Sequence, residues 1–170
     1  VRLGFIDLTL QGTPAIVPPR ALAGLTFQAE AAAANAAARA LRQQGVRAIV
    51  VLLHEGGVPA GHDPNGCQDL TGPIVPIVDA LSHEIDVVVT GHTHRSYVCT
   101  VNGTLVTSAE SYGRLVTDID LQIDRTTGEV VTTRARNVMV TRDIVPMADE
   151  TSLLGHYRPL AARVGQRRVG

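Results

Sequence analysis

Lysine and tryptophan are absent from this chain of 170 residues, and aromatic residues make up only 3% of it. The 15 basic residues are therefore all arginine, and 16 acidic residues bring the formal net charge to −1. With this balance and no basic run, the sequence gives no electrostatic basis for binding nucleic acid or an anionic membrane surface. No run of about 18 apolar residues occurs either, so no membrane-spanning helix is predicted.

Apolar runs of strand length alternate with helix-forming stretches, and hydrophobic residues make up 45% of the chain, enough for one aliphatic core. Two nearly continuous apolar runs, 46–53 and 85–90, are typical of strands buried on both faces of a parallel sheet. Asn102-Gly103 predicts a tight hairpin turn, after which the strands become antiparallel. The pattern predicts an α/β domain with a mixed sheet. The predicted strands are 1–10, 46–53, 85–90, 96–101, 104–108, 115–123 and 130–140, and the predicted helices are 27–44, 72–82 (with Thr71 as N-cap) and 150–164.

Two cysteines, Cys67 and Cys99, allow two interpretations. They are two unrelated buried thiols, since free cysteine is often buried. Alternatively they form one disulfide, because both flank the same helix–strand unit, and the protein then belongs to an oxidising compartment. The sequence leaves both interpretations open.

Three histidines follow directly on the two apolar runs. His54 comes after the run that ends at Leu53, and Gly91-His92-Thr93-His94 comes after the run that ends at residue 90. Because ligand sites in open α/β sheets lie at the carboxyl ends of strands, we expect the three imidazoles at one edge of the sheet. Gly91 frees the backbone to turn, so that the His-x-His pair can converge on a metal ion. The sequence therefore predicts a metal site formed by His54, His92 and His94.

The remaining histidines lack such a context. His83 stands at the end of a predicted helix and His156 lies within the last one, where surface positions are expected. His62 lies in the long loop near the predicted site, where a surface position is the simpler interpretation and a substrate contact the alternative. Glu55, next to His54, either supports the ligands or is a solvated loop acid.

The motifs around these histidines resemble those of a known family. Leu52-Leu53-His54-Glu55-Gly56-Gly57 resembles the late histidine motif of calcineurin-like phosphoesterases, and residues 87–94 resemble their terminal Gly-His-x-His motif. Residues 108–114 resemble the segment that follows in the 5'-nucleotidase branch, and residues 65–70 resemble its secreted bacterial members. The chain thus resembles the C-terminal half of the catalytic domain of a calcineurin-like metallophosphoesterase of the 5'-nucleotidase family.

This resemblance implies part of a four-layer αββα sandwich that holds two divalent metal ions, Zn, Mn or similar. It implies that His54 and His92 bind one metal and His94 the other, and that a hydroxide between the metals attacks the phosphoester in line. The implied activity of the full-length protein is dephosphorylation of nucleotides or related small phosphoesters. From the charge balance, no nucleic acid partner is expected. The implied location is the cell envelope or the outside of the cell.

Three family features have no counterpart in this sequence: an initial Asp-x-His motif, a bridging aspartate and an Asn-His pair that assists the leaving group. We therefore expect residues 1–164 to be the C-terminal half of the domain and residues 165–170 to be a linker toward a further domain. We assign no catalytic residue to this segment and expect the isolated chain to be inactive.

Other activities stay open at this point. Hydrolysis of 2',3'-cyclic nucleotides or of UDP-sugars would use the same metal site. A mononuclear three-histidine zinc hydrolase, with water as the fourth ligand, needs only the residues present. A non-catalytic metal-binding module is a further alternative.

Overall fold

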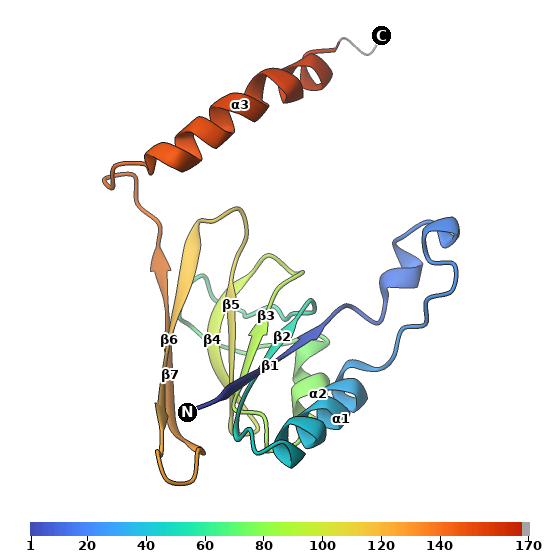
Figure 1. The fold of residues 1–170 in the computed structure, drawn as a ribbon, viewed down its shortest axis with the longest axis vertical. Coiled ribbons are helices and arrows are strands. Elements are labelled where there is room, and N and C mark those ends of the chain that lie inside the picture. Colours follow the sequence, from blue (N-terminus) through green and yellow to red (C-terminus); the bar gives the residue numbers. More distant parts are fainter. Residues whose placement is uncertain (168–170) are drawn as a thin grey trace. The chain divides into compact units, whose positions relative to one another are not determined.

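The computed structural model describes residues 1–167 and confirms the α/β fold with a mixed sheet (Figure 1). The chain divides into two units, Val1–Val140 and Thr141–Gly170. Each predicted helix or strand is present and differs from its predicted range by at most three residues at either end. The strands are β1 (Leu3–Leu8), β2 (Ala48–Leu53), β3 (Val87–Thr90), β4 (Ser96–Val101), β5 (Thr104–Ala109), β6 (Leu115–Ile123) and β7 (Val130–Met139); the helices are α1 (Glu30–Gln43), α2 (Ile74–Asp79) and α3 (Ala148–Gly165), with short 3-10 turns at Thr13–Ala15 and Pro19–Ala21.

The central sheet of the first unit has five strands in the order β1-β2-β3-β5-β4. Its first four strands are parallel neighbours, and β4 pairs antiparallel with β5 at the edge. In the pairing of β2 with β3, Leu53 lies opposite Thr90, so the two strands end in register. The segments that begin at His54 and Gly91 therefore leave the sheet side by side.

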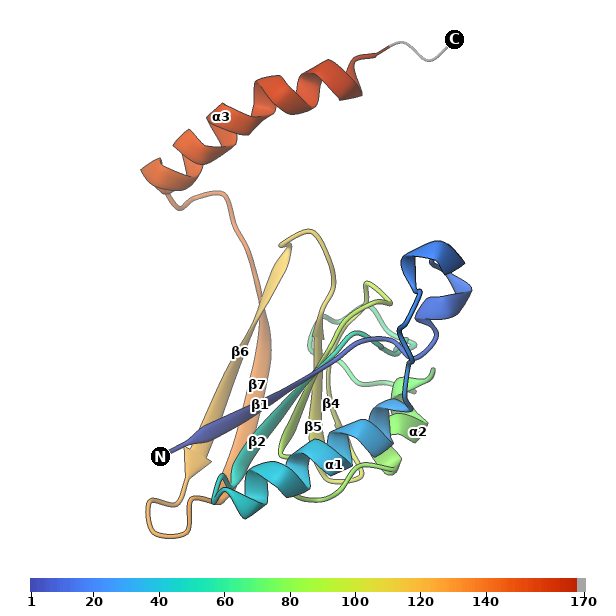
Figure 2. The ribbon, with the colours of Figure 1, turned by 45° about the vertical axis from the view of Figure 1, so that its right-hand side comes forward.

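Helices α1 and α2 cover one face of this sheet (Figure 2). Helix α1 contributes Ala34 and Ala38, both 0% exposed, and such small side chains allow a helix to approach a sheet closely. They pack in one core with Ile49, Val51 and Val88 of the sheet. Burial of each aliphatic strand residue contributes about 1.5–3 kcal/mol, so this layer provides much of the hydrophobic stabilisation.

Strands β6 and β7 form a two-stranded antiparallel sheet on the opposite face. The contact between the two sheets is apolar, with Ile119, Leu121 and Ala135 packed on Val50, Val87 and Leu105. The second sheet covers this face only in part, since Phe5 of β1 is 57% exposed and Leu52 of β2 is 37% exposed. The first unit thus has three layers: helices, a mixed sheet and a hairpin sheet.

Asn137 of β7 joins the two sheets and the long loop after β2. Its side-chain amide donates to the carbonyls of Ser108 (2.8 Å) and Pro64 (2.6 Å), and its Oδ1 accepts from the Thr117 hydroxyl (2.6 Å). Its backbone N–H donates to Oδ1 of Asn65 (2.6 Å). Because Asn137 is only 6% exposed, water cannot replace these partners, and its loss would leave several of them unpaired.

Asn137→Ala is expected to lower the free energy of unfolding by at least about 2 kcal/mol, since each buried polar group left unpaired costs about 1–3 kcal/mol. Urea unfolding of the variant measures this loss. Thr132→Ala, an exposed position on the same strand, is the control and should change stability by less than about 0.5 kcal/mol. Equal stabilities of the two variants would contradict the role given to Asn137.

The start of α2 differs from the prediction. The prediction of Thr71 as the N-cap of α2 was wrong, because Pro73 occupies that position. The Thr71 hydroxyl instead donates to the Val58 carbonyl (3.1 Å). The second unit holds α3, which contains Pro159 and has no buried residue. Residues 168–170 of the predicted linker lie outside the described residues, and the boundary at 164/165 stays a prediction.

Candidate metal centre

His54 is the first residue after β2, and its backbone N–H donates to the Leu8 carbonyl at the end of β1 (3.0 Å). Its side chain is exposed. It borders an open depression of about 730 Å³ at the carboxyl ends of β1, β2 and β3, together with Asp7, Thr9 and Gly91. The location is the one that the strand ends predicted.

His92 lies at the centre of a sharp turn just after β3. Thr93 N–H donates to the Gly91 carbonyl (2.7 Å), and φ of His92 is +64°, which together define a γ-turn of the rare type with positive φ. His94 also has a positive φ, +53°. Such conformations are uncommon for residues other than glycine, and they cluster at functional sites.

This turn brings the rings of His54 and His92 together, with their centres 5.2 Å apart and their planes at 68°. Two imidazoles that bind one tetrahedral ion at about 2.0–2.1 Å place their ring centres about 5 Å apart. The spacing of this pair therefore fits two ligands of a single divalent ion. Imidazole nitrogen is a donor that suits Zn and several other divalent metals.

His94 lies apart from this pair. Its ring meets the edge of the Tyr112 ring, with 5.7 Å between centres. In the part of the chain that the structure describes, no three histidine, cysteine, aspartate or glutamate side chains are grouped closely enough to hold a metal ion. The structure thus brings His54 and His92 together, and the metal site of His54, His92 and His94 stays a prediction.

The two histidine segments are fastened to each other by glycine backbone. The Thr93 hydroxyl donates to the Gly57 carbonyl (2.8 Å), and Gly91 N–H donates to the Glu55 carbonyl (3.3 Å). A Cβ on Gly56 would collide with the Gly91 carbonyl and lie 2.6 Å from Oγ1 of Thr93. Only glycine at position 56 allows this approach.

Tyr97 of β4 is fully buried, and its hydroxyl connects the two histidine segments. Its hydroxyl accepts from Gly57 N–H (3.2 Å) and bonds the Thr90 hydroxyl, which in turn donates to the Thr107 carbonyl (2.8 Å). The network connects the segment after His54 with the last residue of β3. No local sequence pattern marked Tyr97; a single tyrosine within an otherwise aliphatic and threonine-rich strand region is the only signal.

Burial raises the pKa of the Tyr97 phenol above its ordinary value of about 10. The resulting stabilisation is present below about pH 10 and is lost as pH rises through the higher pKa of the folded state. Tyr97→Phe should lower the free energy of unfolding by about 1–3 kcal/mol at neutral pH. Above about pH 10, the stability of the variant should fall less steeply than that of the wild-type protein. The chain has no lysine to mask this effect. Thermal unfolding across alkaline pH measures it, and parallel curves for the two proteins would contradict it.

The other candidate residues have separate surroundings. Glu55 is 8% exposed, and its Oε1 accepts from Gly56 N–H (2.8 Å), so it shapes the loop after His54. His62 is exposed and borders a pocket beside His94. His83 is exposed at the opposite end of the strands, and His156 is exposed on α3.

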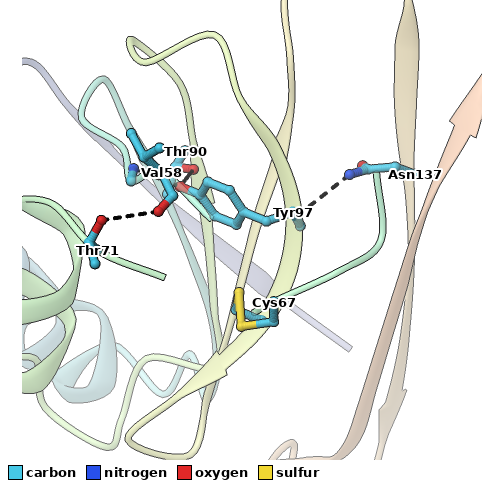
Figure 3. The surroundings of a disulfide bond; sticks show 8 residues. Val58, Cys67, Thr71, Thr90, Tyr97 and Asn137 are labelled. Carbon is cyan, nitrogen blue, oxygen red and sulfur yellow. Dashed lines mark hydrogen bonds between the residues drawn. A yellow bond between two sulfur atoms is a disulfide. The ribbon is translucent and has the colours of Figure 1, made fainter. Parts of the chain in front are cut away.

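The long loop after β2 is fixed by a disulfide, because the structure joins Cys67 to Cys99 of β4 (Figure 3). The same view shows Tyr97 and Asn137 nearby on β4 and β7, and Val58 bonded to Thr71 across the base of the loop. The disulfide, the hydrogen bonds of Asn137 and the pairing of Val58 with Thr71 together hold this loop of irregular backbone, which borders both histidine segments.

No family model matches the chain. Among curated proteins it is 32% identical to endonuclease YhcR of Bacillus subtilis over its whole length, which is 14% of that protein. It is 29% identical to cell wall protein Lmo0130 of Listeria monocytogenes over 90% of the chain, which is 20% of that protein. The chain therefore spans only about one seventh and one fifth of these relatives.

Solved structures show the same architecture. Calcineurin-like phosphoesterase YfkN of Bacillus subtilis superposes with a TM-score of 0.75 over 97% of the chain and 53% of that structure, at 16% identity. The chain has the calcineurin-like phosphoesterase fold. A 5'-nucleotidase precursor of Thermus thermophilus matches this fold with a TM-score of 0.67 over 95% of the chain and 32% of that structure, at 22% identity. The predicted resemblance to phosphoesterases of the 5'-nucleotidase type is thus confirmed in the fold.

Proposed function

We propose that the chain supplies metal ligands to a phosphoester hydrolase of the 5'-nucleotidase type. The observation that carries this proposal is the His54–His92 pair, with ring centres 5.2 Å apart at the ends of two adjacent parallel strands in a phosphoesterase fold. His94, two residues after His92, would contribute to a second metal.

Bound divalent metals would lower the pKa of a bound water and stabilise negative charge on the phosphoryl oxygens. The residues of this chain then have positioning roles. His54 and His92 would hold one ion between them, and the γ-turn at His92 sets the backbone from which its side chain leaves. Tyr97 and Thr93 keep the two segments from separating. Catalytic residues and the remaining ligands belong, in this proposal, to other parts of the full-length protein.

A small nucleotide is the proposed substrate, with 2',3'-cyclic nucleotides and UDP-sugars as alternatives for the same centre. The 5'-nucleotidase relative in structure supports the first. The isolated chain, which lacks an Asp-x-His motif and an Asn-His pair, should be inactive and should hold fewer metals than the full-length protein. A non-catalytic metal-binding module would bind metal without turnover.

The proposed location is the cell envelope or outside the cell. Support comes from the disulfide between Cys67 and Cys99 and from the likeness to a cell wall protein. Among the described residues, no helix combines the length and the apolar character needed to cross a membrane.

The test uses the full-length protein with AMP, a 2',3'-cyclic nucleotide and UDP-glucose. Phosphate release from AMP that stops with a chelator and returns with Zn or Mn is the expected result. Metal-dependent turnover of one of the other two esters instead would identify that alternative. Metal binding without turnover of any ester would overturn the proposal and favour the non-catalytic module.

A further inference from the structure

Two of the four asparagines in this chain precede a glycine, in Asn65-Gly66 and Asn102-Gly103. Asparagine is one of the chemically labile residues of proteins. Before a glycine it is most open to loss of its side-chain amide, because glycine has no Cβ to obstruct its backbone nitrogen and leaves the backbone free to turn. The two pairs share this local sequence, so a difference in their reactivity has to come from the fold.

Asn102 lies at the tip of the hairpin between β4 and β5, at the end of the strands away from the histidine segments. Val101 pairs with Thr104, which leaves Asn102 and Gly103 as an exposed two-residue turn with φ of +47° and +82°. Among the described residues, the Asn102 side chain has one hydrogen bond, from Nδ2 to the Asp79 carbonyl, and at 3.5 Å it is weak. The space around Gly103 is open, since a Cβ there would meet nothing within 4 Å.

Asn65 is also an exposed residue, but its carboxamide is held on both sides. Its Oδ1 accepts from the Asn137 N–H (2.6 Å), and its Nδ2 donates to the Asn137 carbonyl (3.2 Å). The nitrogen of the next residue is engaged as well, because Gly66 N–H donates to the Asp63 carbonyl (2.9 Å). One residue further on, the disulfide joins Cys67 to β4. The carboxamide and the nitrogen that would attack it are therefore both fixed.

Deamidation requires these two groups to move toward each other. The backbone nitrogen of the glycine attacks the side-chain carbonyl carbon of the asparagine, a C–N bond forms, and the side-chain nitrogen leaves as ammonia with the proton of the glycine N–H. Water then opens the cyclic imide at one of its two carbonyl carbons and gives aspartate or isoaspartate, with one added negative charge. Water is the only co-reactant. At Asn65 the reaction must first break three hydrogen bonds, whereas at Asn102 it must break one weak bond.

We propose that Asn102 is a site of deamidation in the folded protein and that the fold protects Asn65. The inference is independent of the proposed function. In the isoaspartate product the side-chain methylene becomes part of the main chain, so a turn that the β4–β5 pairing closes with two residues becomes longer. Strand β4 carries Tyr97 and Cys99, so the modification alters the end of the strand that anchors the histidine segments and the long loop.

The test follows both asparagines in one sample of the full-length protein, incubated folded at slightly alkaline pH, with peptide mapping by mass spectrometry. Asn102 should lose its amide at least about tenfold faster than Asn65, a ratio that corresponds to about 1.4 kcal/mol of additional barrier at Asn65. In denaturant the two rates should become similar, because the hydrogen bonds that distinguish them are lost. Asn102→Gly is the control variant, since Gly-Gly suits a two-residue hairpin turn and has no amide to lose.

Isoelectric focusing gives a second measurement on the intact protein. The incubated wild-type protein should accumulate a more acidic form, and Asn102→Gly should accumulate it at least about tenfold more slowly. Equal rates at the two asparagines in the folded protein, or a faster reaction at Asn65, would overturn the proposal. Reaction of both asparagines in denaturant and of neither in the folded protein would overturn it too, because the hairpin turn would then protect Asn102.

Discussion

Gly56→Ala is expected to weaken metal binding by the full-length protein about 10- to 100-fold, as is typical when the residues that orient metal ligands are disturbed. The added Cβ would collide with the Gly91 carbonyl and press on Oγ1 of Thr93 at 2.6 Å. Because the Gly91 carbonyl accepts the hydrogen bond of the γ-turn at His92, relief of this clash should disturb the turn that places His92 beside His54. Overpacking of this kind also costs about 1–3 kcal/mol of stability.

Isothermal titration with Zn or Mn measures the affinity, and thermal unfolding measures the stability. Gly61→Ala is the matched control in the same loop, because its Cβ would meet only Oε1 of Gln68 at 3.5 Å, an ordinary contact. If Gly56→Ala binds metal like Gly61→Ala, the close approach of the two segments does not position the histidines.

Loss of the disulfide should lower the free energy of unfolding by about 3–4 kcal/mol, since Cys67 and Cys99 are 32 residues apart and cross-links of this span restrict the unfolded chain by about that amount. The comparison is between the wild-type protein and the double variant Cys67→Ala/Cys99→Ala in urea unfolding. The long loop that borders both histidine segments should also become sensitive to proteases.

A reductant provides the control for the loss of stability on removal of the disulfide. It should destabilise the wild-type protein by the same amount and leave the double variant unchanged, because Cys67 and Cys99 are the only cysteines. A wild-type protein whose unfolding midpoint does not respond to reductant would contradict the contribution given to the disulfide.

The sequence predicted the strand ends and the convergence of His54 and His92, because both follow from local patterns. Continuous apolar runs identify β2 and β3 as buried parallel strands, and neighbouring parallel strands end at the same edge. The position of His94 could not be predicted in this way. It depends on backbone angles at His92 and His94 that only the packing of the surrounding loops decides.

The supporting residues were missed for a related reason. Tyr97 and Asn137 act through hydrogen bonds to residues far away in the sequence, such as Gly57, Pro64 and Thr117. No periodicity or short motif encodes such partners. Thr71 shows the same limit, since a residue with the character of an N-cap instead bonds Val58 across the loop.

The central claim is that His54 and His92 bind one metal ion in common, and calorimetric titration of the full-length protein with Zn or Mn tests it most directly. The account predicts that His54→Ala and His92→Ala each lose one equivalent of tightly bound metal, while His83→Ala, an exposed histidine at the opposite end of the strands, keeps the wild-type stoichiometry. Wild-type stoichiometry and affinity in both His54→Ala and His92→Ala would contradict the shared site.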